Sequence, residues 1–212
     1  KFKSLDYIQH LAHSLMDLNC KRDTVLVALG GGTVGDTVGF LSSIFMRGIR
    51  YINVPTTLLA MVDSSIGGKT GVNYEGVKNV LGAFHQPQLV CIDPLFLKSL
   101  DKKQIYSGIG EVIKYGLISG PKILDNLIKN YNCIIQVKDL DLISNIIYQS
   151  CLAKKLFIEK DVLDEGYRNI LNFGHTLGHI IESKYQLQGI THGESVINGM
   201  FLSLKLSNYK KI

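Results

Sequence analysis

The sequence has 212 residues, of which 46% are hydrophobic and 21 are glycine, as in a globular protein with one or two domains and many tight turns. The net charge is +5, and the lysines are scattered rather than gathered in one run. The basic tail at residues 209–211 is too short for a nucleic-acid arm, so we expect no nucleic-acid partner; an anionic small molecule fits the basic balance at least as well.

Cysteine usage and the lack of targeting signals favour a cytoplasmic protein without a membrane partner. The four cysteines are far apart and form no CxxC pair, which argues against a disulfide framework or a thiolate zinc site. No signal peptide, long apolar span or lipidation motif is visible. The chain begins at Lys1 without a methionine and ends just past an apolar-periodic stretch, so we expect a fragment.

In chain order, the first half alternates strand and helix patterns. Residues 24–29 form a buried-strand run, residues 30–36 a glycine turn, and the stretch to Met46 a helix; residues 49–54 and 89–92 are further strands. Short connections between them predict a parallel α/β sheet. Residues 62–88 are glycine-rich and polar, and we expect a functional loop there.

The character of the sequence changes at Asp93-Pro94. Aspartate is a good N-cap and proline suits a first helical turn, and nearly everything beyond has helical periodicity. We therefore expect a Rossmann-like parallel sheet domain over residues 1–94 and an α-helical, metal-binding domain over residues 95–212.

Gly30, Gly32 and Gly35 form a GxGxxG pattern that follows a strand and opens a helix. In this context the glycines let a pyrophosphate approach the backbone, and the helix N-terminus supplies N–H donors and a positive dipole. The acid expected after the second strand to hold a ribose is absent, so this is not an ordinary dinucleotide fingerprint. A glycine turn used only for packing is the alternative.

The most informative motif is His175-x-x-x-His179, because the i, i+4 spacing places two imidazoles on one helical face. Glu111 and His192 lie in glycine-containing segments elsewhere in the chain. Two or three histidines with one carboxylate is the ligand set of a catalytic zinc that keeps one position open. The alternative is one core histidine and one surface histidine.

Cationic and polar residues provide candidate ligand-binding groups, several of them beside glycines or other small residues. Any one of these lysines could instead be a solvated surface group, Asp63 could cap a local turn, and Glu111 with Lys114 at i, i+3 could be a surface ion pair. The candidates are Arg47, Asp63, Lys69, Lys78, Asn79, Lys114, Lys154 and Arg168.

Taken together, these segments closely resemble the 3-dehydroquinate synthase family of the shikimate pathway. The resemblance runs through the chain in the family's order. The matching runs are residues 30–36, 46–48, 55–59, 62–71, 78–79, 110–116, 172–179 and 192–194.

The resemblance implies a lyase that depends on NAD and on zinc, with Co²⁺ as a substitute, and that acts on 3-deoxy-D-arabino-heptulosonate 7-phosphate. Enzymes of this family oxidise C5 transiently with NAD, eliminate phosphate, return the hydride, open the ring and close a carbocycle. The products are 3-dehydroquinate and phosphate, with no net change in NAD. A homodimer is implied, in which Arg47 reaches the phosphate of the neighbouring subunit.

Residue roles follow from the same resemblance. Glu111, His175 and His192 would hold the metal, and His179 would contact substrate or support the ligands. The other implied substrate contacts are Asp63, Lys69, Lys78, Asn79, Lys114, Lys154, Arg168 and Asn172. The implied cofactor contacts are Lys3, Gly31, Gly32, Asp36, Thr56, Thr57, Lys69, Lys78 and Ser99.

Two departures from the family pattern are expected to matter. The chain lacks the leading strands, including the acid that would hold the adenosine ribose, and it stops before the C-terminal helices and a further substrate lysine. Three alternatives stay open: a sister sugar-phosphate cyclase that makes an inosose or valiolone ring, a metal-dependent polyol dehydrogenase, and a non-catalytic fragment that binds only zinc or a partner. The sister cyclases tend to change the positions matching Arg168 and Asn172, both of which are kept here.

Overall fold

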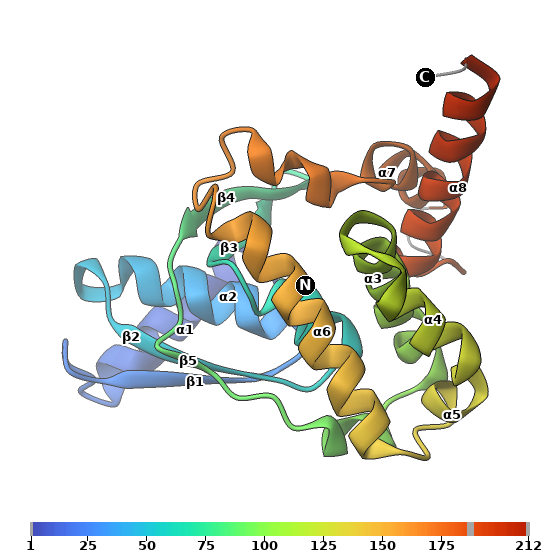
Figure 1. The fold of residues 1–212 in the computed structure, drawn as a ribbon. Helices are drawn as coiled ribbons and strands as arrows, with labels where there is room; N and C mark the ends of the chain where they lie inside the picture. Colours follow the sequence, from blue (N-terminus) through green and yellow to red (C-terminus); the bar gives the residue numbers. More distant parts are fainter. Residues whose placement is uncertain (1, 186–188, 211–212) are drawn as a thin grey trace. The chain divides into compact units, whose positions relative to one another are not determined.

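The computed structural model describes residues 2–185 and 189–210 (Figure 1). The chain separates into two compact units: unit 1 comprises Lys1–Thr56 and Ser64–Asp93, and unit 2 comprises Thr57–Asp63 and Pro94–Ile212. Among the described residues, no helix combines the length and apolar character needed to cross a bilayer.

Unit 1 is built around a short parallel sheet. Its elements are α1 (Leu5–Asp17), β1 (Val25–Gly30), α2 (Gly32–Ile44), β2 (Arg50–Pro55), β3 (Lys69–Tyr74), β4 (Val77–Phe84) and β5 (Leu89–Val90). The sheet order is β1-β2-β5, and both pairings are parallel. The helix α2 follows β1 directly and contacts β1, β2 and β3. The predicted α/β class and its parallel sheet are confirmed.

Glycines let α2 approach the strands closely. A Cβ on Gly35 would lie 2.9 Å from the Asn53 side chain of β2, and one on Gly39 would lie 2.4 Å from the Thr70 methyl group of β3. A small apolar core joins α1, α2 and β3 beside this contact, and its buried members are Ile8, Leu41, Phe45, Ile49 and Val72. This packing fixes the position of α2, and with it the glycine turn that joins β1 to α2.

The predicted helix to Met46 ends earlier, at Ile44. A short 3-10 helix follows over Phe45–Arg47, in which Met46 and Arg47 have φ of 48° and 66°. Non-glycine residues rarely adopt this left-handed conformation, and two in succession cannot continue an α-helix.

The expectation that residues 62–88 form a loop was wrong. Most of this stretch is an antiparallel hairpin of β3 and β4, with Val72 paired to Leu81. The turn has positive φ at Glu75 (47°) and Gly76 (78°), as the tight hairpin turns require. The glycines and polar residues within both strands hide the alternation that would otherwise predict them.

Unit 2 is helical. Its helices are α3 (Lys102–Ser119), α4 (Pro121–Lys129), α5 (Tyr131–Ile135), α6 (Leu140–Ile158), α7 (His175–Lys184) and α8 (His192–Lys210). The helix α3 contacts α4, α6 and α8, and α7 packs along α8. Asp93-Pro94 opens a 3-10 helix, Pro94–Ser99, and the first long helix starts later, where the Asp101 side chain accepts a 2.7 Å hydrogen bond from the Lys103 amide.

Candidate functional site

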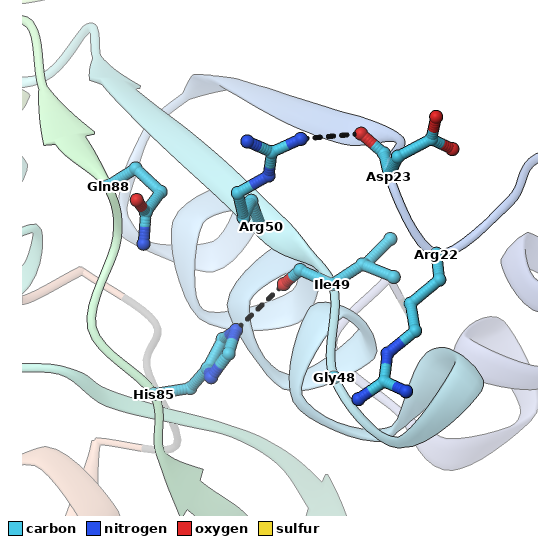
Figure 2. Close-up of a pocket in the computed structure, with 7 residues that line it drawn as sticks. All are labelled: Arg22, Asp23, Gly48, Ile49, Arg50, His85 and Gln88. Carbon is cyan, nitrogen blue, oxygen red and sulfur yellow. Dashed lines mark hydrogen bonds between the residues drawn. The ribbon is translucent and has the colours of Figure 1, made fainter.

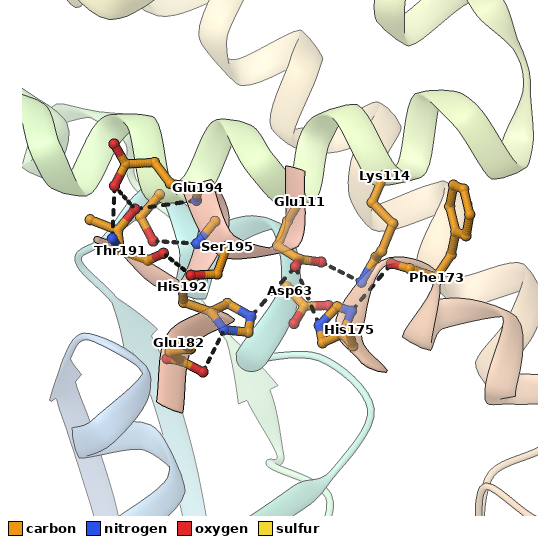
Figure 3. Close-up of polar contacts among 12 residues, drawn as sticks. Asp63, Glu111, Lys114, Phe173, His175, Glu182, Thr191, His192, Glu194 and Ser195 are labelled. Atoms are coloured by element: carbon orange, nitrogen blue, oxygen red, sulfur yellow. Dashed lines mark hydrogen bonds and ion pairs between the residues drawn. The ribbon is translucent and has the colours of Figure 1, made fainter. Parts of the chain in front are cut away.

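Three helices of unit 2 each contribute one residue to a partly buried cluster (Figure 3). Glu111 lies in the middle of α3 and is fully buried, His175 opens α7, and His192 opens α8. One potential ligand atom from each of the three lies within 4.8 Å of the others. The family resemblance implied these three as metal ligands, and the fold brings them together.

A glycine lies next to each of the three residues, and each is needed for close helix packing. A Cβ on Gly193 would lie 1.9 Å from the Ser107 carbonyl oxygen of α3, and one on Gly110 would lie 2.6 Å from Gly193. A Cβ on Gly174 would lie 2.4 Å from the Met200 side chain of α8. Such approaches leave no room for any side chain, so these glycines set the spacing at which the three functional side chains meet.

The start of α8 is fixed by a reciprocal cap. The Thr191 amide and hydroxyl each donate a 2.7 Å hydrogen bond to Glu194 Oε2, and the Glu194 amide donates to Thr191 Oγ1 at 3.3 Å. This is the capping-box arrangement. It holds His192 in the first turn of α8.

Both imidazoles present the same nitrogen to Glu111. His175 Nε2 lies 3.6 Å and His192 Nε2 3.7 Å from Glu111 Oε1. On the other side of the rings, His175 Nδ1 donates to the Phe173 carbonyl at 3.3 Å, and His192 Nδ1 lies 3.9 Å from Glu182 Oε2. An Nδ1 that carries the proton leaves the Nε2 lone pair of a neutral imidazole available for a metal ion.

The charges around Glu111 keep it ionised. Burial and Asp63 raise the pKa of Glu111, but His192, Lys114 and His175 outweigh them and lower it below its ordinary value. Burial lowers the pKa of His175, which favours its neutral, metal-binding form. For His192, burial acts in the same direction, but the neighbouring Glu111 and Glu182 carboxylates raise its pKa.

Lys114 is a buried partner of Glu111. It is 2% exposed and forms an ion pair with the Glu111 carboxylate, so the pair predicted by the i, i+3 spacing belongs to the protein interior. The two charges together cost less to bury than either alone.

Asp63 forms a second polar centre in unit 2. Its Oδ1 lies 2.8 Å from Lys154 Nζ and accepts a hydrogen bond from the Tyr115 hydroxyl, while its carbonyl accepts one from Lys154 at 2.6 Å. Burial raises the pKa of Asp63, but Lys154 and Lys114 outweigh it and lower the pKa. Burial lowers the pKa of Lys154, partly offset by Asp63. Asp63 is therefore an ionised contact between α3 and α6.

The other predicted residues of unit 2 vary in burial. Arg168 is 3% exposed, and its guanidinium donates to the Val162 carbonyl at 3.1 Å. His179 is exposed, with its ring 5.5 Å from that of His175. Asn172 and Ser99 are exposed and bond to Asn169 and the Phe96 carbonyl respectively.

In unit 1, five of the predicted cofactor residues, Lys3, Gly31, Gly32, Asp36 and Thr56, lie around the junction of β1 and α2. Gly31 precedes the first turn of α2, whose Val34 and Gly35 amides donate to its carbonyl. Lys3 Nζ lies 2.5 Å from Asp36 Oδ2, and the Thr56 amide donates to the Gly30 carbonyl at 2.9 Å. A Cβ on Gly32 would lie 2.7 Å from Ser64 Oγ, so the turn has no space for a larger residue. Thr57, at the start of unit 2, caps the next turn by accepting from the Ala60 amide at 3.2 Å.

The remaining predicted residues of unit 1 are on its surface. Lys69 starts β3, and Lys78 and Asn79 lie on β4, all three exposed. Arg47 is also exposed, in the left-handed turn after α2. Beside Arg47, a pocket of about 550 Å³ opens at the start of β2 (Figure 2). Its lining includes none of the predicted residues and consists of Arg22, Asp23, Gly48, Ile49, Arg50, His85 and Gln88.

Sequence reasoning missed two buried polar residues. Tyr115, which donates to Asp63, directly follows Lys114, but nothing in the pattern separates it from an ordinary core tyrosine. Glu182 is 5% exposed and lies at i+7 from His175 and i+3 from His179. Helical periodicity places it on the histidine face of α7 and could have identified it.

Comparisons with known proteins agree with the geometry. The family model for the N-terminal part of 3-dehydroquinate synthase matches residues 1–107, and the model for its C-terminal part matches residues 108–212. The chain is 49% identical to a 3-dehydroquinate synthase of Clostridium tetani, over 98% of this chain and 55% of that protein.

Two solved structures are similar over 99% of this chain. One is 2-epi-5-epi-valiolone synthase from Streptomyces hygroscopicus with NAD⁺ and Zn²⁺ bound, with a TM-score of 0.91, 28% identity and 58% of that chain covered. The other is 2-deoxy-scyllo-inosose synthase complexed with carbaglucose-6-phosphate, NAD⁺ and Co²⁺, with a TM-score of 0.91, 31% identity and 57% covered. The chain thus spans little more than half the length of the relatives it matches. With both family models matching in order along its whole length, the chain belongs to the 3-dehydroquinate synthase family.

Proposed function

We propose that this protein is a 3-dehydroquinate synthase that converts 3-deoxy-D-arabino-heptulosonate 7-phosphate to 3-dehydroquinate and phosphate, as a cytoplasmic enzyme of the shikimate pathway. The observation that carries the proposal is the convergence of Glu111, His175 and His192 beside buried cations, in a chain of this family. Residues 1–94 would form the NAD-binding domain, and residues 95–212 the metal and substrate domain.

The residues of the cluster fit a divalent metal ion. Both Glu111 oxygens are buried: Oε2 is ion-paired with Lys114, and Oε1 faces the two imidazoles without a hydrogen bond within the described part of the chain. A buried carboxylate facing two Nε2 atoms is a donor set suited to zinc or cobalt. When bound, the metal supplies Lewis acidity that favours loss of the proton from the hydroxyl to be oxidised and polarises the resulting ketone.

The turn between β1 and α2 fits the phosphates of NAD. Gly31 and Gly32 present backbone without side chains at the start of a helix. Lys3 and Asp36, paired at 2.5 Å, and Thr56 lie at the same end of unit 1 as further cofactor contacts. When bound, the nicotinamide supplies a transient hydride acceptor.

The chain's own residues would bind and orient an anionic substrate. Lys114, Lys154 and Arg168 are nearly fully buried. In addition to burial, the positive charges of Lys114 and Arg168 lower the pKa of Lys154. Glu111 is the ion-pair partner of Lys114, and Asp63 is that of Lys154. Ammonium and guanidinium groups form strong, charge-assisted hydrogen bonds with phosphate and carboxylate oxygens, so these residues suit a ligand that carries both groups.

The remaining assignments extend this proposal. His179 and Asn172 would contact the substrate in unit 2, and Lys69, Lys78 and Asn79 from the hairpin of unit 1, with Lys69 and Lys78 also touching the cofactor and Ser99 a further cofactor contact. The enzyme would act as a homodimer, with Arg47 reaching the substrate phosphate of the neighbouring subunit. A ketone at C5 acidifies the neighbouring C–H, so phosphate elimination needs only a modest base. The main contribution of these residues would therefore be to hold the substrate and the cofactor in the reactive orientation.

A sister sugar-phosphate cyclase is the second candidate, because the two similar solved structures are named as a valiolone synthase and an inosose synthase. Their identity to this chain, 28% and 31%, is lower than the 49% of the curated 3-dehydroquinate synthase. The chain also has Arg168 and Asn172, at the two positions that the sister cyclases tend to change.

The test is phosphate release from the heptulosonate phosphate with NAD and zinc supplied, while NADH absorbance is followed. We expect phosphate without accumulating NADH, and no phosphate from Glu111→Gln. Net NADH formation would indicate a polyol dehydrogenase. Turnover of a sugar phosphate that lacks the carboxylate, in preference to the heptulosonate, would indicate a sister cyclase.

A further inference from the structure

Glu182 is a buried carboxylate with no role in the assignments above. It lies on α7, is 5% exposed, and projects toward the first turn of α8 (Figure 3). Its helical spacing from His175 and His179 places the three side chains on one face of α7. One oxygen of its carboxylate, Oε2, lies 3.9 Å from His192 Nδ1.

The two histidines of the cluster are held in parallel ways. Each turns Nε2 toward Glu111, and each has an acceptor on its Nδ1 side. For His175 the acceptor is the Phe173 carbonyl, at 3.3 Å, and for His192 the nearest carboxylate oxygen on that side is Glu182 Oε2, at 3.9 Å. Metal-binding histidines commonly donate their second N–H to a carbonyl or a carboxylate, which fixes the tautomer and the orientation of the ring.

His179, Glu182 and His192 also lie close enough together to suggest a second cation site. A neutral imidazole has only one lone-pair nitrogen, so His192 could bind two ions only by losing its remaining proton. Donating that proton to Glu182 requires no such loss. The chemistry therefore favours Glu182 as an acceptor.

We propose that Glu182 is a positioning residue, whose carboxylate accepts the Nδ1 proton of His192 and so directs Nε2 toward the metal ion held with Glu111 and His175. The proposal rests on the metal site of the proposed function. It assigns no contact between Glu182 and substrate.

The test is the zinc affinity of the metal-free protein, measured by competition with a chromophoric chelator. Glu182→Ala should weaken binding roughly 10–100-fold, as removal of such hydrogen-bonding partners does elsewhere. Glu182→Gln keeps the volume and an acceptor oxygen, so its loss should be smaller. The control is Glu159→Gln, which removes one negative charge from the exposed residue that follows α6 and should not change the affinity.

Two further measurements separate positioning from a structural role. The visible spectrum of the Co²⁺-loaded protein should shift in Glu182→Ala, because the His192 ring is no longer fixed. Ile143→Ala, which removes a buried side chain of α6 away from the cluster, should lower thermal stability and leave both zinc affinity and spectrum unchanged.

Unchanged zinc affinity in Glu182→Ala would overturn the proposal. So would a second bound zinc equivalent that is lost in both Glu182→Ala and His179→Ala, since that would establish a cation site. If Glu182→Ala keeps wild-type zinc affinity and the wild type releases phosphate, only this inference fails. If the zinc affinity falls as expected but the wild type turns over no heptulosonate phosphate, the proposed function fails and the inference stands.

Discussion

The glycine turn of unit 1 and the cluster of Glu111, His175 and His192 in unit 2 are assembled differently. The turn is made of backbone at one strand–helix junction, and the residues that contact it, among them Thr56 and Ser64, belong to the same unit. The cluster is made of side chains from α3, α7 and α8, and it depends on glycines at which those helices touch. A substitution in the turn should therefore act locally, whereas one at a helix contact should disturb every member of the cluster.

The largest effect is expected for Glu111→Gln. It removes one proposed metal ligand and leaves Lys114 buried without its partner, so metal binding and turnover should be lost and stability should fall by about 3–5 kcal/mol. Metal content after dialysis and chemical unfolding measure the two effects. A variant that keeps stoichiometric metal would contradict the assignment; Glu159→Gln is the control.

Gly193→Ala tests whether helix contacts set the cluster. Its Cβ would lie 1.9 Å from the Ser107 carbonyl, so α3 and α8 must separate, at a cost of roughly 1–3 kcal/mol or more. Zinc affinity should fall with stability, although no ligand has changed. Gly166→Ala is the control, because a Cβ there meets nothing within 4 Å. Wild-type zinc affinity in Gly193→Ala would show that the cluster tolerates movement of α8.

Lys154→Met should separate substrate binding from metal binding. Loss of a charged hydrogen bond to an anionic substrate costs about 1.5–3 kcal/mol, which corresponds to a KM raised roughly 10–100-fold. Zinc affinity should not change, since Lys154 contacts Asp63 and not the ligands. The control is Lys155→Met, at an exposed neighbouring lysine. An unchanged KM would remove Lys154 from the substrate contacts.

Gly32→Ala should act on unit 1 alone. The added Cβ would lie 2.7 Å from Ser64 Oγ, so the Ser64 side chain or the turn must shift where the cofactor phosphates are expected. We expect NAD affinity to fall about tenfold, equivalent to about 1.4 kcal/mol, with zinc affinity intact. Equilibrium titration with NAD measures this, with Thr33→Ala as control. Equal losses of NAD and zinc affinity would contradict the local character of the turn.

The smallest effect is expected at alkaline pH in unit 1. Burial, and then the Asp36 carboxylate, raise the pKa of Tyr51 to about 12. Above pH 10 the unfolded chain loses this proton while the folded chain keeps it, so stability should fall between pH 10 and about 12, by at most about 1.4 kcal/mol per pH unit. Tyr51→Phe should flatten this part of the stability profile. An equally steep profile in the variant would exclude Tyr51 as the cause.

Much of the fold followed from local patterns. The strand runs at β1 and β2 and the glycine turn predicted the parallel α/β unit, and helical periodicity beyond Pro94 predicted the second one. The β3–β4 hairpin was missed, because its strands contain glycines at positions 71 and 82 where the two backbones approach too closely for side chains. Strands are predicted from an alternation of apolar and polar side chains, and glycine at these positions interrupts that alternation.

The sequence by itself determined the family, the candidate ligand types and the glycine turn, because these depend on residue identity and short spacings. Only the tertiary structure decided that Glu111 and Lys114 are a buried pair, that Lys154 meets Asp63, and that Glu182 faces His192. Burial and partner choice arise where helices cross, and the closeness of each crossing depends on residues far apart in the chain, such as Ser107 and Gly193. No local spacing encodes that distance.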